Sequence, residues 1–203
     1  MFITFEGCDG SGKSTQLRFA KEYLESVGIP VLATREPGGS VVAEKIRSII
    51  LSTESVGMTA ETELLLYTAA RVQHVEEIVL PALEAGKVVL CDRFIDSTIA
   101  YQGVARGLGI DHVVALFEST CGLYPDLTIW MDVDSASAFE RKGGVDEDDR
   151  LEAEGKSFHE KVYDGYRRAY ERYPDRIVRV VADKTKWDTK ALIQGILAEK
   201  LHV

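Results

Sequence analysis

The residues with the clearest chemistry form a glycine-rich segment near the N-terminus, Gly7-Cys8-Asp9-Gly10-Ser11-Gly12-Lys13-Ser14-Thr15. Its spacing, Gly-x-x-x-x-Gly-Lys-Ser, matches the Walker A pattern (P-loop), in which backbone N–H groups surround phosphate oxygens. We expect Lys13 to reach the β- and γ-phosphates and the hydroxyl of Ser14 to ligate Mg²⁺. The segment therefore predicts a site for a nucleoside triphosphate with its metal ion.

A second pair of candidates, Asp92 and Arg93, follows directly after an apolar run at residues 88–91. In open α/β sheets, ligands bind at the carboxyl ends of the strands. Asp92 could hold Mg²⁺ there, directly or through water, and Arg93 could reach a phosphoryl group. Such a pair can also be an ordinary surface ion pair, but the P-loop beside it favours the metal site.

A small kinase needs a second phosphate-binding site opposite its P-loop and a lid that excludes water. Arginines that could supply them are spread over several predicted loops: Arg35, Arg71, Arg93, Arg141 and Arg150. The polar segment at residues 141–155 is the candidate lid. The chain has no Asn-Lys-x-Asp segment of the kind with which switch GTPases select guanine.

Five apolar runs predict the strands that must position these groups, at residues 2–5, 31–34, 88–91, 126–133 and 177–181. Helical patterns alternate with them, the longest at residues 61–85, and this alternation gives parallel βαβ units. A stripe formed by Phe158, Val162, Tyr166 and Tyr170 is typical of core packing. We therefore predict the α/β class: one domain over residues 1–203 with a three-layer P-loop NTPase fold, a five-stranded parallel sheet flanked by helices, and a short lid.

The composition limits the classes of partner. A net charge of −9 over 203 residues argues against binding to nucleic acid or to anionic membranes. The three cysteines show no metal-binding or disulfide spacing. No apolar stretch is long enough to span a bilayer, and the first strand begins directly after Met1. We therefore expect a cytoplasmic protein.

The order and spacing of its motifs make the chain resemble the thymidylate (dTMP) kinases over nearly its whole length. The shared segments are Phe5-Glu6-Gly7-x-Asp9-Gly10-Ser11-Gly12-Lys13-Ser14-Thr15, Thr34-Arg35-Glu36-Pro37-Gly38-Gly39, Leu66-Tyr67-x-Ala69-x-Arg71-x-Gln73-His74, Asp92-Arg93-Phe94 with Ser97, Tyr101-Gln102-Gly103, and Asp149-Arg150-x-Glu152. This resemblance implies transfer of the γ-phosphoryl group of ATP to dTMP, giving dTDP and ADP for dTTP synthesis, with Mg²⁺ as cofactor. It also implies a homodimer.

The resemblance further implies how the phosphate and sugar of dTMP are bound. Asp9 would bind the 3′-hydroxyl or help to place the acceptor phosphate. Arg35 and Pro37 would border that phosphate, and Arg93 would be its principal cation. Tyr101 would pack near the sugar.

At the base, Tyr67 would stack on the thymine ring, at a position that is usually Phe in the family. Arg71 would hydrogen-bond the pyrimidine or its phosphate side. The resemblance places Ser97 in the same site, with Thr98 and Gln102 at the edge of the base. We expect no functional role for His74.

The catalytic charge is expected to come partly from the lid. No arginine occupies residues 8–11 of the P-loop, whereas some members of the family have one there. We therefore expect Arg141 first, and Arg150 next, to join Lys13, Arg93 and Asp9 as catalytic residues. The acidic run at residues 146–149 is interpreted as a solvated loop.

Two alternatives stay open. The chain could be another small P-loop kinase that acts on a different nucleotide or on a deoxynucleoside. It could also be a non-catalytic P-loop switch, although the arginines of the predicted acceptor site count against a switch.

Overall fold

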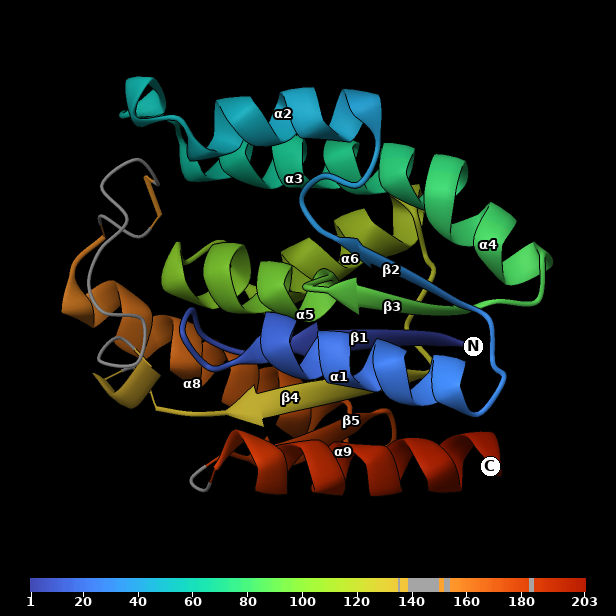
Figure 1. The fold of residues 1–203 in the computed structure, drawn as a ribbon. Coiled ribbons are helices and arrows are strands. Elements are labelled where there is room, and N and C mark those ends of the chain that lie inside the picture. Colours follow the sequence, from blue (N-terminus) through green and yellow to red (C-terminus); the bar gives the residue numbers. More distant parts are fainter. Residues whose placement is uncertain (135, 139–149, 152–153, 183–184) are drawn as a thin grey trace.

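The computed structural model describes residues 1–134, 136–138, 150–151, 154–182 and 185–203. Five parallel strands form one sheet in the order β2-β3-β1-β4-β5 (Figure 1). The strands are β1 (Phe2–Glu6), β2 (Val31–Arg35), β3 (Val88–Asp92), β4 (Leu127–Asp132) and β5 (Ile177–Val181). The predicted α/β class and the five-stranded parallel sheet are confirmed, with strand ends within one residue of those expected.

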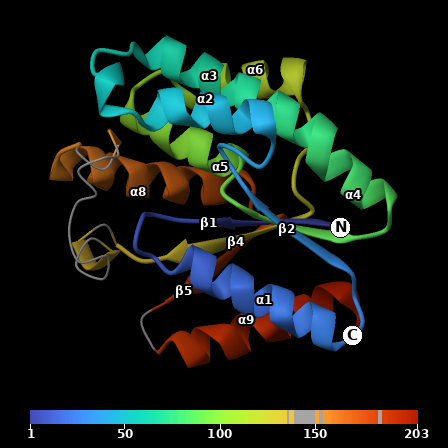
Figure 2. The same ribbon diagram turned by 45° about the horizontal axis from the view of Figure 1, so that its top comes forward.

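Helices cover both faces of the sheet. They are α1 (Lys13–Ser26), α2 (Val41–Leu51), α3 (Ala60–His74), α4 (Leu80–Glu84), α5 (Ile95–Thr98), α6 (Ile110–Thr120), α8 (Lys156–Arg172) and α9 (Lys186–Leu201). Helices α1 and α9 lie side by side on one face, and α5 and α8 lie on the other (Figure 2). Helix α2 packs along α3 on the outside of this second layer.

The register of the strands brings the site together. Asp92, the last residue of β3, pairs with Phe5 of β1 on one side and with Arg35 of β2 on the other. Because the strands are parallel, the loops that follow β1, β2 and β3 meet at one edge of the sheet. Strand β3 is buried except at Asp92, as expected for a central strand with helices on both faces.

The turn from β1 into α1 depends on glycine. Gly7 has φ +138°, and a Cβ at this position would lie 2.6 Å from the carbonyl oxygen of Met131. Gly12 caps α1 with φ +93°, in the left-handed region that favours glycine. The two glycines let the loop bend tightly and place the N-terminus of α1 at the edge of the sheet.

The long helical pattern predicted at residues 61–85 is interrupted. Helix α3 ends at His74, a π-helical segment follows (η2, Val75–Val79), and α4 then begins. Pro81 lies in the first turn of α4. Proline has no N–H, and its ring displaces the carbonyl four residues earlier, so the regular α-helical ladder cannot continue through it. The segment after α5 is also π-helical (η3, Ile99–Ala105).

The aromatic stripe on α8 packs in the core as predicted. Val162 and Tyr166 are almost fully buried and Phe158 is 9% exposed, while Tyr170 packs at the edge. Gly165 allows α8 to approach η3 closely, since a Cβ there would lie 2.5 Å from the Cα of Ala100. Among the described residues, no helix has both the length and the apolar character needed to cross a membrane.

Candidate functional site

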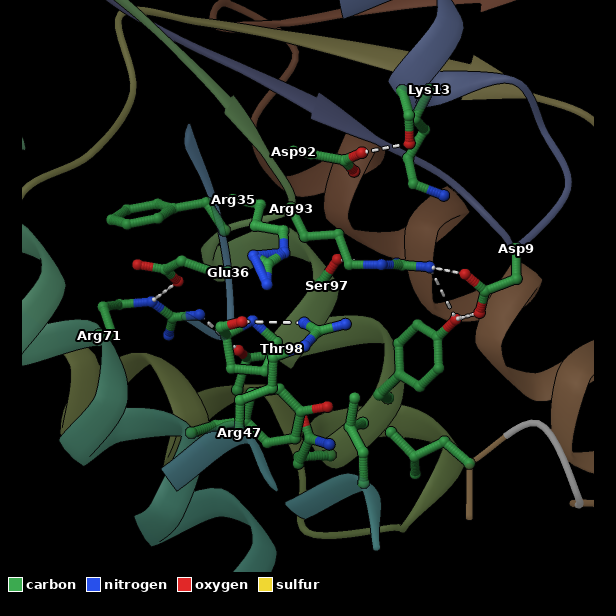
Figure 3. Close-up of a pocket in the computed structure, with 18 of the residues that line it drawn as sticks. Asp9, Lys13, Arg35, Glu36, Arg47, Arg71, Asp92, Arg93, Ser97 and Thr98 are labelled. Atoms are coloured by element: carbon green, nitrogen blue, oxygen red, sulfur yellow. Dashed lines mark hydrogen bonds and ion pairs between the residues drawn. The ribbon is translucent and has the colours of Figure 1, made fainter. Parts of the chain in front are cut away.

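A cavity with a volume of about 420 Å³ lies at the carboxyl ends of β1, β2 and β3 (Figure 3). This volume is within the range of small-molecule binding sites. Most of the residues predicted from the sequence line it: Asp9, Gly10, Gly12, Lys13, Ser14, Thr15, Arg35, Pro37, Tyr67, Arg71, Asp92, Arg93, Ser97, Thr98, Tyr101 and Gln102. The cavity therefore contains the P-loop at one end and side chains of α3 and η3 at the other.

Lys13 is held inside the P-loop. Its side chain is almost fully buried, and Nζ donates a hydrogen bond of 2.9 Å to the carbonyl oxygen of Cys8. Burial and the nearby charge of Arg93 lower the pKa of Lys13. Cys8 is buried, and its burial raises the pKa of the thiol to about 11, so it stays protonated at neutral pH.

Ser14 and Asp92 face each other between α1 and β3. The hydroxyl of Ser14 donates a hydrogen bond of 2.6 Å to Oδ2 of Asp92. Hydroxyl and carboxylate oxygens are the ligands that Mg²⁺ prefers, and Mg²⁺ usually takes one or two protein oxygens together with substrate phosphates. The donor set therefore fits a magnesium ion held jointly by the protein and a nucleotide.

Arg93 connects the P-loop to the rest of the cavity. Its NH2 group donates to the carboxylate of Asp9 and, at 3.3 Å, to the hydroxyl of Tyr101. Its NH1 group donates to the carbonyl of Gly7 at 3.2 Å, to Ser97 at 3.1 Å and to Tyr166 at 2.8 Å. Arg93 has φ +68°, a left-handed conformation that is uncommon for a side-chain-bearing residue. These contacts fix the guanidinium in one place.

Asp9 is the acidic partner in this cluster. Burial alone would raise the pKa of its carboxyl group, but the charges of Arg93 and Lys13 and the hydroxyl of Tyr101 hold it well below its ordinary value. The Tyr101 hydroxyl donates to Oδ2 of Asp9 at 2.9 Å. Asp9 is therefore an anion within the P-loop whose oxygens are directed to Arg93 and Tyr101.

Glu6 is a buried acid behind Arg93 that the sequence analysis did not single out. Its carboxyl group accepts the backbone N–H of Phe94 at 2.7 Å and the hydroxyl of Ser97 at 2.5 Å. Burial, together with the charge of Asp96, raises the pKa of Glu6 to about 8. Its signal in the sequence is an acidic residue that directly continues the apolar strand β1, at the centre of the sheet.

Glu36 and His74 form a second buried group, whose contacts the sequence did not predict. Glu36 accepts a 2.8 Å hydrogen bond from Nε of Arg71 and lies 3.0 Å from Nδ1 of His74. Nε2 of His74 lies 2.7 Å from the hydroxyl of Thr34. Arg71 also donates to Thr98 at 2.8 Å. His74 is therefore structural, as expected, but it connects β2 with α3 and supports Arg71 through Glu36.

Two further arginines, Arg35 and Arg47, line the cavity. Arg35 makes a double hydrogen bond with Glu44, at 3.1 and 3.0 Å. Arg47, which the sequence analysis did not name, donates to the carbonyl of Pro37 at 2.8 Å and lines the cavity. Tyr67 lines the same cavity from α3 and is partly buried.

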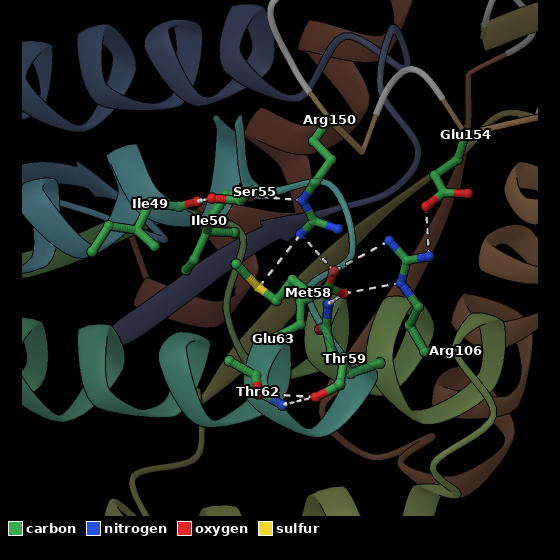
Figure 4. Close-up of polar contacts among 11 residues, drawn as sticks. Ile49, Ile50, Ser55, Met58, Thr59, Thr62, Glu63, Arg106, Arg150 and Glu154 are labelled. Carbon is green, nitrogen blue, oxygen red and sulfur yellow. Dashed lines mark hydrogen bonds and ion pairs between the residues drawn. The ribbon is translucent and has the colours of Figure 1, made fainter. Parts of the chain in front are cut away.

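Of the two predicted lid arginines, the structure describes Arg150. Arg141 lies outside the described residues, as does the acidic run at 146–149. Arg150 is 9% exposed and donates to the carbonyl of Ile50 at 3.1 Å and to Glu63 at 2.6 Å (Figure 4). It is therefore bound to α2 and α3 in this structure, and its catalytic role stays a prediction.

Comparison with known proteins gives concordant matches. The family model described as "Thymidylate kinase" matches residues 5–193. A thymidylate kinase of Finegoldia magna is 55% identical over 82% of this chain and 83% of its own length. One of Bacillus velezensis is 49% identical over 92% of this chain and 89% of its own length. The crystal structure of thymidylate kinase from Ehrlichia chaffeensis is 34% identical, with a TM-score of 0.77 over 97% of this chain and 98% of that one.

Proposed function

The chain belongs to the thymidylate kinase family and is an ATP-dependent dTMP kinase, and we propose how its cavity transfers the γ-phosphoryl group of ATP to dTMP. The observation that carries the proposal is the continuity of one cavity, with Lys13 and Ser14 at one end and Tyr67 and Gln102 at the other. Donor and acceptor can therefore lie in line within a single site.

The P-loop would bind the phosphates of ATP. Its backbone N–H groups and the N-terminus of α1 favour anions, and Lys13 would bind the β- and γ-phosphates. The buried hydroxyl of Ser11 has no hydrogen-bond partner among the described residues, so it is available to a phosphate oxygen or to water.

Ser14 and Asp92 would hold Mg²⁺. Their facing oxygens, 2.6 Å apart, support this assignment. When bound, Mg²⁺ would neutralise charge on the phosphates that Lys13 also contacts.

The other end of the cavity would hold dTMP. Tyr67 would stack on the thymine, with Arg71, Thr98 and Gln102 along the edge of the base. Toward the P-loop, Tyr101 and Asp9 would meet the sugar, with the carboxylate of Asp9 as acceptor for the 3′-hydroxyl. Arg35, Pro37, Arg93 and Ser97 would surround the acceptor phosphate, and the newly identified Arg47 is a further cation for it.

No general base is required for the transfer. A nucleotide monophosphate is mostly doubly ionised at neutral pH, so its phosphate oxygen is already a nucleophile. That oxygen forms a bond to the γ-phosphorus while the bond to the β–γ bridging oxygen breaks, and the electron pair stays with ADP. Positioning and charge neutralisation by Lys13 and Arg93, with Arg141 or Arg150 from the lid, would supply the catalysis.

An exposed apolar face on α2 and α3 supports a proposal for the quaternary structure. It includes Val42, Ile49 and Leu65, of which Ile49 and Leu65 are half exposed. We infer that this face forms a homodimer of single-domain subunits. ATP and dTMP as substrates are compatible with the cytoplasm as the site of action.

A panel of acceptors tests the proposal. ADP production should depend on added dTMP and should be much slower with dCMP, dAMP or thymidine. Preference for unphosphorylated thymidine would indicate a deoxynucleoside kinase. Hydrolysis of ATP that does not respond to any monophosphate would indicate a nucleotide switch.

A further inference from the structure

Glu63 is a buried acid on α3 for which the phosphoryl transfer itself provides no role (Figure 4). It is only 1% exposed, yet three side chains donate hydrogen bonds to it. Nε2 of Gln102 donates to Oε1 at 2.8 Å, and Arg150 donates to Oε2 at 2.6 Å. Arg106 donates to both oxygens, at 3.2 Å each.

These contacts keep Glu63 ionised. Burial alone would raise its pKa, but the hydrogen bonds from Gln102, Arg106 and Arg150 bring the pKa below its ordinary value. Two guanidinium groups also balance the buried negative charge, as a carboxylate removed from water requires. An ionised carboxylate can only accept hydrogen bonds.

Because the Glu63 carboxylate can only accept hydrogen bonds, it fixes the direction of the Gln102 amide. The two ends of a glutamine side chain, an NH₂ donor and a carbonyl acceptor, have nearly the same shape, so only the neighbours decide which end points where. The NH₂ group must face the carboxylate of Glu63. The carbonyl oxygen Oε1 then points away from Glu63, and Gln102 lines the substrate cavity.

The amide direction matters for the base that the cavity accepts. A carbonyl oxygen can accept the N3–H of thymine. Cytosine has a lone pair at N3, which would face the lone pairs of the Gln102 carbonyl, and an unpaired buried acceptor is costly. The argument rests on the proposed function, which places the pyrimidine beside Tyr67 and Gln102.

We propose that Glu63 is a positioning residue for base selection: it orients the Gln102 amide so that the cavity favours pyrimidines with a proton on N3. Arg106 and Arg150 support this role because they stabilise the charge of Glu63. Arg106 is itself bound on its outer side by Glu154 at 2.5 Å.

The test compares two acceptors, dTMP and 5-methyl-dCMP, which share the methyl group and differ at the N3 and C4 edge. In Glu63→Gln, the new amide can donate to the Gln102 carbonyl, so the Gln102 amide is free to turn its NH₂ group to the cavity. We expect the ratio of kcat/KM for dTMP to that for 5-methyl-dCMP to fall by about tenfold or more, mainly through KM.

Glu154→Gln is the matched control. It makes the same carboxylate-to-amide change beside Arg106 but leaves the contact between Glu63 and Gln102 in place, and its ratio should equal that of the wild type. A loss of activity in Glu63→Gln that is equal for both acceptors would mean a merely structural role and would overturn the proposal.

Gln102→Leu provides a second test in a protein that keeps Glu63. It should lower the ratio by itself, and adding Glu63→Gln to it should produce no further change. An unchanged ratio in Gln102→Leu, or a further fall in the double variant, would contradict the proposal. A wild-type enzyme without preference for dTMP would instead contradict the proposed function.

Discussion

The hydroxyl of Ser14 lies 2.6 Å from Oδ2 of Asp92, so a P-loop side chain and the acid at the end of β3 are in direct contact. The two residues are 78 positions apart in the sequence. Parallel pairing of β1 with β3 brings the P-loop and Asp92 to the same edge of the sheet. The proposed magnesium site therefore depends on the central strands and not on a mobile loop.

Asp92→Asn should weaken the binding of magnesium. The neutral amide loses the charge of the carboxylate, so we expect the Mg²⁺ concentration for half-maximal turnover to rise at least about tenfold. A magnesium titration of ADP production measures this effect. Asp111→Asn, at an exposed position on α6, should titrate like the wild type. A normal magnesium dependence in Asp92→Asn would remove this residue from the metal site.

Lys13→Ala should lower kcat by roughly a thousandfold or more, because the charge on the transferring phosphoryl group loses its P-loop cation. The hydrogen bond of Lys13 goes to the carbonyl of Cys8 within the same P-loop, so the fold should be retained. Steady-state kinetics measures the loss in kcat, and circular dichroism checks that the fold is retained. Turnover near that of the wild type would contradict the role of the P-loop lysine.

Arg93→Lys should impair the use of dTMP more than the binding of ATP. A lysine cannot reproduce five contacts made by a planar guanidinium. We expect kcat/KM for dTMP to fall by about a hundredfold, with the KM for ATP changing by less than about threefold. Arg172→Lys, on the surface of α8, is the control. Equal losses for both substrates would argue against an acceptor-phosphate role.

Glu6→Gln should change the pH dependence of stability. The pKa of Glu6 is raised from 4.5 to about 8 in the folded protein, by burial and by Asp96, so the folded state retains a proton that the unfolded state loses above pH 4.5. The wild type therefore loses stability as the pH rises from 4.5 to 8, and the variant lacks this loss.

The measurement is the difference in Tm between Glu6→Gln and the wild type. It should be constant below pH 4.5 and should shift in favour of the variant up to about pH 8. A difference that does not vary with pH, or that shifts toward the wild type, would show that Glu6 is ionised in the folded protein.

The proposed dimer can be tested on α2 and α3. Replacing both Ile49 and Leu65 with Glu places charges on the exposed apolar face and should give a monomer by light scattering. Replacing Leu192, an equally exposed residue of α9, with Glu should leave the mass of the dimer unchanged. A wild-type protein that is already monomeric at micromolar concentration would contradict the proposal.

The sequence predicted those parts of the site that carry local patterns. The Walker A spacing, the apolar run before Asp92 and the alternation of strands and helices are all visible within short windows. Residues such as Glu6, Glu36 and Glu63 have no such pattern. Their partners lie 88, 35 and 87 positions away, and only the folded chain brings them together.

For Tyr166 the sequence predicted the burial of the side chain but not its hydrogen bond. Its spacing on α8 predicted burial, and it is buried. The same spacing could not show that its hydroxyl reaches Arg93 at 2.8 Å, because that contact depends on how α8 packs against the sheet. The π-helical segments η2 and η3 also lack a sequence period that would distinguish them from α-helix.

Three arginines of the cavity have an acidic partner in the protein: Arg35 with Glu44, Arg71 with Glu36, and Arg93 with Asp9. The cavity is therefore closer to neutrality than its arginines suggest. Binding of dTMP becomes an exchange, in which the nucleotide must compete with a resident carboxylate for each guanidinium. A simple anion that offers charge but no base or sugar contacts gains little from such an exchange, so the pairing protects the cavity from small anions while a nucleotide can still enter.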